Sequence, residues 1–362
     1  MSRRTEKLSF RGAVLGLACV SAFFGLGAPP AEARTVTIKA VFSYLAPDGT
    51  IARALHPAQL AEAMREGGQL WVDIDATDPP QHALLEKVFG FHHLAIEDTL
   101  SPQTRVKIEE YPAHLFLVIR GIQFDGSTPD PYDLETANLY CFLAGNTLVT
   151  VHARPSAAVT EMQDRLARSP DLLGRGVEMI LHGVVDHTVD EYLPIVDRVD
   201  DIVDDLEERI FDQFDDAAIH EIFRVKRLVV QVRRHLGPLR EVLNILTNRP
   251  QASIDPASQV YFRDVYDHTI RIVESVDSTR DLLTSVLDSY LSQASNRLNK
   301  SMKSLSAVAT ISLPLVVIGG MFGMNFAHIP LSNHPLGFFW AVGMMVLLAA
   351  VMLWFLRKQG WV

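Results

Sequence analysis

Residues 305–356 decide the architecture of this chain, and they read LSAVATISLPLVVIGGMFGMNFAHIPLSNHPLGFFWAVGMMVLLAAVMLWFL. The stretch contains no Asp, Glu, Lys or Arg. It divides into two apolar segments, residues 305–324 and 336–356, each close to the roughly 20 residues that a helix needs to cross a bilayer. A buried hairpin in a soluble core is the alternative, but two such lengths in succession favour two membrane-spanning helices.

Basic residues flank the two predicted spans on one side only. They are Arg297, Lys300, Lys303, Arg357 and Lys358. The loop between the spans, residues 325–335, has no Lys or Arg. Because basic flanks are retained in the cytoplasm, we predict a protein of the inner (plasma) membrane whose soluble N-terminal domain and C-terminus are both cytoplasmic.

The N-terminal leader conflicts with this orientation. Within residues 1–34, basic residues precede an apolar stretch at residues 12–27, and Ala31-Glu32-Ala33 then resembles a signal-peptidase site. A cleaved export signal would place the following domain outside the membrane. We give more weight to the flanks of the spans. Residues 1–34 are therefore either signal-like or a wrongly assigned start that precedes Val36.

Residues 35–155 are predicted to form an α/β domain. Short runs rich in β-branched and aromatic residues are bounded there by Gly, Pro, Asp or Asn, a pattern that is typical of strands. The predicted elements are strands at residues 36–45, 70–74, 115–119, 139–143 and 147–151 and a helix at residues 80–89. This domain is cytoplasmic in the orientation predicted above.

Residues 156–303 are predicted to be almost wholly helical, and residues 304–362 form the two-span module. Gly237-Pro238 and Asn248-Arg249-Pro250 predict helix breaks, because proline lacks a backbone N–H. No proline lies between Pro256 and Pro314, so one long helix is predicted to run from the soluble region into the membrane. The fold class is therefore an α/β cytoplasmic domain followed by long α-helices and two transmembrane helices.

The composition excludes several classes of function. The chain has 33 Lys and Arg against 43 Asp and Glu, a net charge of −10, which argues against nucleic acid as a partner and suits a cation ligand. Cys19 and Cys141 are too few for a disulfide framework or a thiolate metal site. The sequence has no Gly-rich phosphate loop and no Ser/His/Asp arrangement, so we do not predict an enzyme.

The charges are also unevenly distributed along the helical region. Residues 197–216 contain ten acidic and two basic residues, whereas residues 224–240 contain six basic and no acidic ones. Two solvated helix faces that attract each other explain this pattern. A cluster that concentrates divalent cations is the alternative interpretation.

One face of the predicted long helix changes character along its length. Taken at spacings of three or four, it reads Asp288, Ser292, Ser295, Asn299, Met302, Ser306, Ala309, Leu313, Val316 and Gly320. Polar groups followed by small and apolar groups suit a pore with a wet inner end and an apolar constriction that gates by dewetting. Small residues equally allow close helix packing in lipid, so both interpretations stay open.

The triplet Gly323-Met324-Asn325 lies at the outer end of the first predicted span. Mg²⁺ prefers six oxygens and gives up its water reluctantly. If several chains meet on one axis, a ring of Asn325 amides and backbone carbonyls can hold the hydrated ion without trapping it. Otherwise Asn325 merely caps the helix.

In its context, the triplet carries a family resemblance. Phe322-Gly323-Met324-Asn325-Phe326, followed by the second span and the ending RKQGWV, resembles the CorA magnesium/cobalt transporter family. Four upstream segments are similar to family segments in the same order, namely FGFHHLAIED at 89–98, RVKIEEY at 105–111, PLREVL at 238–243 and YFRDVYDH at 261–268. The resemblance covers residues 36–362.

The resemblance implies a homopentamer with a funnel-shaped cytoplasmic domain, whose five long helices form the inner ring around a pore. The family's selectivity site maps onto Gly323, Met324 and Asn325. Its pore and gate positions map onto Asp288, Asn299, Met302 and Leu305. Its regulatory metal sites, which lie between neighbouring subunits, map onto Glu97 and Asp98 on one side and onto Asp264 and Asp186 on the other.

The implied function is gated, passive uptake of Mg²⁺, and also of Co²⁺ or Ni²⁺, with closure by cytoplasmic Mg²⁺. Two departures from the family matter. Val316 stands in the outer pore lining where a hydroxyl residue is common in the family, and the outer loop lacks an acidic residue and contains His328 and His334 instead. Imidazole suits Zn²⁺, Ni²⁺ and Co²⁺, so a ZntB-like Zn²⁺ transporter, driven by protons, is the alternative. A membrane-anchored sensor that does not conduct is a third hypothesis.

Overall fold

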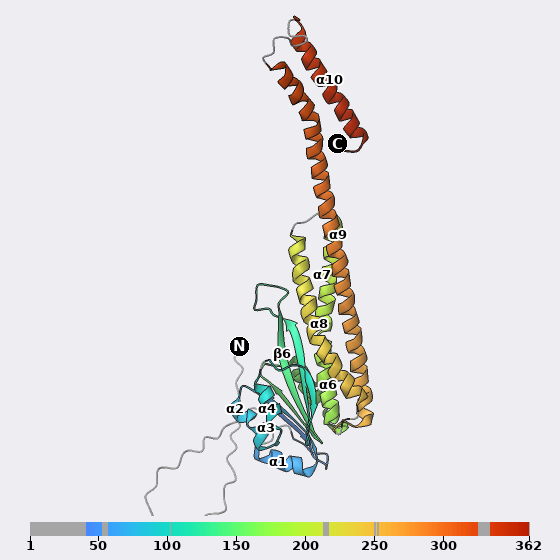
Figure 1. Cartoon of the computed structure of the whole chain (residues 1–362). Coiled ribbons are helices and arrows are strands. Elements are labelled where there is room, and N and C mark those ends of the chain that lie inside the picture. The colour runs from blue at the N-terminus through green and yellow to red at the C-terminus, as the bar shows by residue number, and fades with distance from the viewer. Residues whose placement is uncertain are drawn as a thin grey trace, which may run out of the picture. The chain divides into compact units, whose positions relative to one another are not determined.

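The computed structural model describes residues 41–52, 57–101, 103–212, 217–249, 251, 253–324 and 334–361 (Figure 1). These residues fall within one compact unit, Ile38–Val362. The predicted leader, Asn325 and His328 lie outside the described residues.

Within the described residues, seven strands form one mixed sheet in the order β2-β1-β3-β7-β6-β5-β4. The strands are β1 (Val41–Leu45), β2 (Ile51–Ala52), β3 (Gln69–Asp75), β4 (Lys107–Glu110), β5 (Leu115–Phe124), β6 (Leu134–Ala144) and β7 (Thr147–His152). Strands β3 and β7 pair in parallel, with Leu70 opposite Thr147, and the other described pairs are antiparallel. The five predicted strands are confirmed over their described residues.

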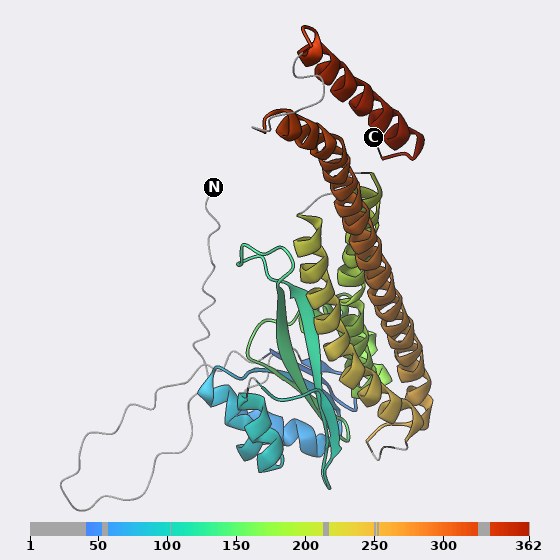
Figure 2. The same cartoon turned by 45° about the horizontal axis from the view of Figure 1, so that its top comes forward.

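Helices cover both faces of this sheet. The short helices are α1 (Pro57–Glu66), α2 (Pro79–His82), α3 (Leu84–Lys87) and α4 (His93–Leu100). The later ones are α5 (Ala157–Arg168), the 3-10 helix η1 (Pro170–Arg175), α6 (Val177–Asp190), α7 (Leu193–Asp212), α8 (Ala218–Asn248), α9 (Pro256–Phe322) and α10 (Gly337–Lys358). Figure 2 shows the short helices on one side of the sheet and the later ones on the other.

Strand alternation creates a separate core on each face. Along β5, Leu115, Leu117 and Ile119 contribute to the core that includes α5–α9. The intervening Phe116 and Val118 contribute to the core that includes α1, α3 and α4. Successive side chains of a strand point to opposite faces, so the hydrophobic run buried on both faces specifies a three-layer arrangement of helices, sheet and helices.

The long helix α9 spans 67 residues, which corresponds to roughly 100 Å of continuous helix. It begins where the Asp255 side chain accepts a hydrogen bond from the Ala257 amide at 2.9 Å, and Pro256 occupies its first turn. Pro314 lies inside it without ending it. The predicted continuous helix is therefore confirmed.

Two local predictions are wrong. No break occurs at Gly237-Pro238, because α8 continues to Asn248 with Pro238 inside it. Leu236, Leu239 and Val242 on either side of the proline are buried in the core, and this packing offsets the lost backbone bond. The predicted break after Asn248 is confirmed.

The predicted helix at residues 80–89 is instead two short helices, α2 and α3, separated at Ala83. Gln81 fixes the first turn by accepting from the Asp75 amide at 3.0 Å and donating to Asp78 at 2.8 Å. Buried Leu84 and Leu85 fix the second turn independently. The sequence also gave no signal for β2 and β4, which are short strands at the two edges of the sheet.

Candidate cation pathway and metal-binding groups

The two predicted spans are helices that the chain itself hardly covers. Helices α9 and α10 each contain an apolar window long enough to cross a membrane, and only 6% and 11% of those windows are buried. A hairpin in a soluble core would have most of its apolar residues buried. Burial therefore favours cover by lipid or by other chains over the soluble-hairpin alternative.

Helix α9 uses one face of its apolar half to contact α10. Ala307 is buried and Ile311, Leu315, Ile318 and Phe322 are partly buried, at spacings of three or four. A Cβ atom added to Gly319 would lie 3.6 Å from the Met345 side chain of α10, so the two helices approach closely here. This spacing defines the face of α9 that packs on the second span.

Two of the predicted pore-facing residues, Asn299 and Met302, line a hollow together with Gly360 and Trp361, which follow α10. Asp288, Asn299, Met302 and Leu305 are all exposed in the single chain, with Leu305 at 72%. The apolar continuation of the same stripe, including Leu313 and Val316, is exposed as well. Over the residues that the structure describes, the single chain forms no pore, and most of this stripe is accessible to neighbours or solvent.

Gly323 and Met324 end α9. The Gly323 amide donates to the carbonyl oxygens of Gly319 at 3.0 Å and Gly320 at 3.1 Å. Met324 is 50% exposed. Asn325, the residue whose side-chain amide carries the predicted selectivity, lies outside the described residues, so its role remains a prediction.

Helix α4 positions the first predicted pair of metal ligands. The helix begins after His92, whose Nδ1 accepts a hydrogen bond from the Leu94 amide at 3.3 Å, and buried Ala95 anchors it to the sheet. Glu97 is exposed, and Asp98 is half-buried. The exposed Glu97 carboxylate is accessible to a cation or to a neighbouring chain.

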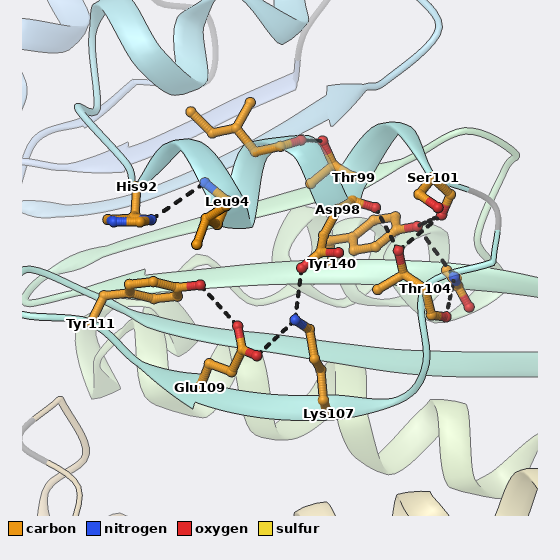
Figure 3. Close-up of polar contacts among 12 residues, drawn as sticks. His92, Leu94, Asp98, Thr99, Ser101, Thr104, Lys107, Glu109, Tyr111 and Tyr140 are labelled. Carbon is orange, nitrogen blue, oxygen red and sulfur yellow. Dashed lines mark hydrogen bonds and ion pairs between the residues drawn. The ribbon is translucent and has the colours of Figure 1, made fainter.

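Asp98 is engaged within its own chain. Its Oδ2 atom lies 2.7 Å from the Lys107 ammonium, which also lies 2.7 Å from Glu109 Oε1. Figure 3 shows Lys107 on β4 between these two carboxylates. Burial opposes the charge on Lys107, but the bonds to Asp98 and Glu109 outweigh it and raise the pKa of the ammonium. Lys107 is therefore a fixed positive charge beside the predicted metal ligand.

A second group forms between α6 and α9. One ligand atom each from Asp186, Asp190 and His268 lie within 4.8 Å of one another, close enough to hold a metal ion. Burial and the neighbouring Asp186 carboxylate raise the pKa of Asp190. Crowded carboxylates of this kind are stabilised by a bound cation, so the donor set fits a divalent ion.

Asp264, the remaining predicted ligand, lies one helical turn before His268 and is exposed. Burial lowers the pKa of the nearby His182 imidazole, although Asp186 and Asp264 oppose this shift electrostatically. Asp264 and Asp186 therefore both influence the pKa of His182, and both lie on the α6 and α9 side of the sheet.

The structure thus separates the predicted regulatory residues into two groups. Asp186 joins Asp190 and His268, whereas Glu97 and Asp98 lie on α4, against the opposite face of the sheet. Asp190, His268 and Lys107 were missed by the sequence reasoning. A signal existed for the first two, because Asp186 and Asp190, like Asp264 and His268, are four residues apart on one helix face. Lys107 had none.

Known proteins resemble this chain in sequence over most of its length. Residues 66–358 match the family model described as CorA-like Mg²⁺ transporter protein. The cobalt/magnesium transport protein CorA of Thermotoga maritima is 30% identical over 295 residues, which are 80% of this chain and 83% of that protein. The zinc transport protein ZntB of Yersinia enterocolitica is 22% identical over 324 residues, which are 89% of this chain and 96% of that protein.

The fold of this chain also resembles a solved structure of a metal ion transporter. The complete structure of the CorA magnesium transporter from Methanocaldococcus jannaschii matches with a TM-score of 0.77 at 21% identity, and the match covers 90% of this chain and 100% of that one. A sheet domain, a long helix α9 that ends in one apolar span, and a second apolar helix α10 together define a two-span membrane protein with a large domain outside the membrane. The chain belongs to the CorA-like family of divalent metal ion transporters. Membership in a family of transporters supports a function other than catalysis.

Proposed function

We propose that this chain forms a gated, passive channel for divalent cations, chiefly Mg²⁺ and also Co²⁺ or Ni²⁺, that closes when cytoplasmic Mg²⁺ binds between subunits. In this proposal, several copies, five by family resemblance, surround one axis with the exposed stripe of α9. Asn325 then forms the outer selectivity ring, and Asn299, Met302 and Leu305 form the narrow inner part. The basic flanks of the spans favour a cytoplasmic position for the soluble domain and the C-terminus.

The observation that carries the regulatory part is the separation of the two acidic groups. Glu97 and Asp98 belong to the α4 side of the sheet, and Asp186 and Asp264 to the α6 and α9 side. Because the sheet lies between them, one chain does not join them around an ion. In a ring of subunits, the α4 side of one copy can face the α9 side of the next.

Closure follows because a bound divalent ion changes the interaction between facing subunits from repulsive to attractive. Facing carboxylates on adjacent subunits repel, and a bound Mg²⁺ converts this repulsion to attraction and holds the ring closed. When internal Mg²⁺ falls, the sites empty and the open state gains population. Two charges that cross 100 mV gain roughly 4.6 kcal/mol, so uptake needs no ATP site.

The test of this regulation is Asp264→Asn in proteoliposomes of the full chain. The matched control is Asp281→Asn on the same helix, because the Asp281 side chain is 73% exposed and pairs with Arg280 of its own helix. We expect Asp264→Asn to raise the internal Mg²⁺ concentration needed for closure, and Asp281→Asn to leave it unchanged. Equal inhibition of wild type and Asp264→Asn would reject the sensor assignment.

One observation supports the second candidate, a ZntB-like zinc transporter. His268 adds an imidazole to the carboxylates of Asp186 and Asp190, and mixed nitrogen and oxygen sets suit Zn²⁺ and Co²⁺ better than Mg²⁺. The sequence similarity to a zinc transport protein points the same way. Zn²⁺ flux that depends on a pH gradient, without Mg²⁺ flux, would select this candidate.

A further inference from the structure

The acidic pair on α4 already has a cation of its own. The Lys107 ammonium lies 2.7 Å from Asp98 Oδ2 and 2.7 Å from Glu109 Oε1 (Figure 3). The second oxygen of Glu109 accepts a hydrogen bond from the Tyr111 hydroxyl at 2.9 Å. Asp98, Lys107, Glu109 and Tyr111 thus form one chain of contacts that leads from α4 onto the edge strand β4.

A divalent ion that approaches Asp98 must contend with this ammonium. Both cations need the same carboxylate oxygens, and at a separation of a few ångströms they repel each other in proportion to the product of their charges. The side chains of Lys107 and Asp98 are 30% and 28% exposed, so solvent screens this repulsion only in part.

We infer that Lys107 is an internal competitor of the regulatory divalent ion for Asp98, and that it sets the ion concentration at which the intersubunit site fills. This inference rests on the proposed function, because it concerns the same regulatory site. It adds a residue whose side chain is not a ligand and whose charge has the opposite sign.

Glu109 gives Lys107 a second partner. When the divalent ion occupies Asp98, the ammonium keeps its bond to Glu109, which Tyr111 holds in place. Without Glu109, Lys107 would pair with Asp98 alone and compete more strongly. The Lys107 ammonium therefore has two pairing states, one with both carboxylates and one with Glu109 alone. The equilibrium between these states sets the Mg²⁺ concentration at which the site fills.

Competition predicts opposite shifts for two substitutions of partly exposed residues. Lys107→Gln removes the competitor and lowers the Mg²⁺ midpoint roughly tenfold, as expected for the loss of one nearby charge. Glu109→Gln raises the midpoint. In the Lys107→Gln background, the effect of Glu109→Gln disappears, because no ammonium remains to be redistributed. Lys107→Arg keeps the charge and stays near the wild-type midpoint.

The experiment titrates the purified full-length protein in detergent with MgCl₂ and measures the midpoint of protection against limited proteolysis. The matched control is Arg105→Gln, which removes one positive charge from an exposed residue on the same segment. Thermal unfolding in EDTA checks that each variant folds. The combination of a lower midpoint for Lys107→Gln, an unshifted control and a Glu109 effect that vanishes in the double variant supports the inference.

Three outcomes overturn it. A Lys107→Gln midpoint at or above that of wild type rejects the competitor. A Glu109→Gln shift that persists in the double variant also rejects the inference. So does an Arg105→Gln midpoint that shifts as far as that of Lys107→Gln, because the shifts would then reflect general electrostatics rather than competition for Asp98. If the wild-type protein shows no Mg²⁺-dependent transition, the proposed sensor function itself fails. A wild-type transition with unshifted variants rejects the inference alone.

Discussion

The α/β domain and the pair of apolar helices differ in how far they bury their apolar side chains. In the domain, Phe142 is fully buried and stacks on Phe91 with ring centroids 4.4 Å apart. In the α9–α10 pair, Leu313 is 67% exposed although it is equally apolar. The domain completes its core within one chain, whereas the apolar windows of the helix pair are only 6% and 11% buried and need cover by lipid or by other chains. Function is therefore expected where the single chain is incomplete.

The largest effect is expected at Asn325, the residue that follows Met324 in the sequence. Asn325→Ala removes the proposed ring of amides, so we expect divalent flux in proteoliposomes to fall to background while the thermal unfolding of the soluble domain stays unchanged. Wild-type flux in this variant would favour the non-conducting sensor and would remove the functional contrast between the two regions.

The next effect compares one buried and one exposed apolar side chain directly. Phe142→Ala is expected to cost about 3–5 kcal/mol in the free energy of unfolding, because it leaves a cavity among stacked rings. Leu313→Ala in the same detergent-solubilised protein should cost less than about 1 kcal/mol, since its side chain has few partners within the chain. Chemical denaturation of both variants measures the difference, and equal costs would show that the helix pair is as self-sufficient as the domain.

A smaller effect is expected at the contact between the sheet and α6. A Cβ atom at Gly121 would overlap Glu191 Oε2, which accepts a hydrogen bond from the Ile122 amide at 3.3 Å. Gly121→Ala must push the end of this flexible side chain away from the Ile122 amide, so we expect a loss of about 1.5 kcal/mol in the free energy of unfolding, chiefly from the lost hydrogen bond. Gly126→Ala is the matched control, because a Cβ atom there would meet nothing within 4 Å. Equal stability of the two variants would contradict the close packing.

The smallest effect is a pH dependence within the domain. Burial alone would lower the pKa of His152, but its contact with Asp73 at 3.1 Å outweighs this and raises it. A raised pKa means that the stabilisation is complete below the unfolded value and is lost as the pH rises through the folded value. We expect the free energy of unfolding to fall by about 1 kcal/mol between pH 6 and pH 9, and His152→Gln to flatten this slope. A slope that persists in His152→Gln would assign it to other groups.

Local patterns predicted most of the fold. The uncharged run of residues 305–356 predicted both apolar helices, and the proline-free stretch after Pro256 predicted α9 as one element. Pro238 misled, because whether a helix survives a proline depends on packing from distant parts of the chain. Strand β4, with the sequence KIEE, carries too many charges for a strand pattern and is stabilised by pairing with β5.

The candidate metal-binding groups were predictable only in part, because they too depend on packing between separate elements. Resemblance supplied Glu97, Asp98, Asp186 and Asp264, but it did not show that the helices carrying them lie against opposite faces of the sheet. The meeting of Asp186 with His268 depends on how α6 packs on α9, and the pairing of Asp98 with Lys107 depends on how α4 lies beside β4. The four-residue spacings on α6 and α9 indicate which side chains share a helix face, but they do not show that the two helices meet or that α4 lies beside β4.

Flux through the purified full-length protein in liposomes tests the central claim most directly. Mg²⁺, Co²⁺, Ni²⁺ and Zn²⁺ are compared with and without a pH gradient, at low and at high internal Mg²⁺. A passive channel predicts Mg²⁺ flux that needs no pH gradient and that stops when internal Mg²⁺ is high. Absence of Mg²⁺ flux, or flux of Zn²⁺ alone that requires a pH gradient, would contradict the account.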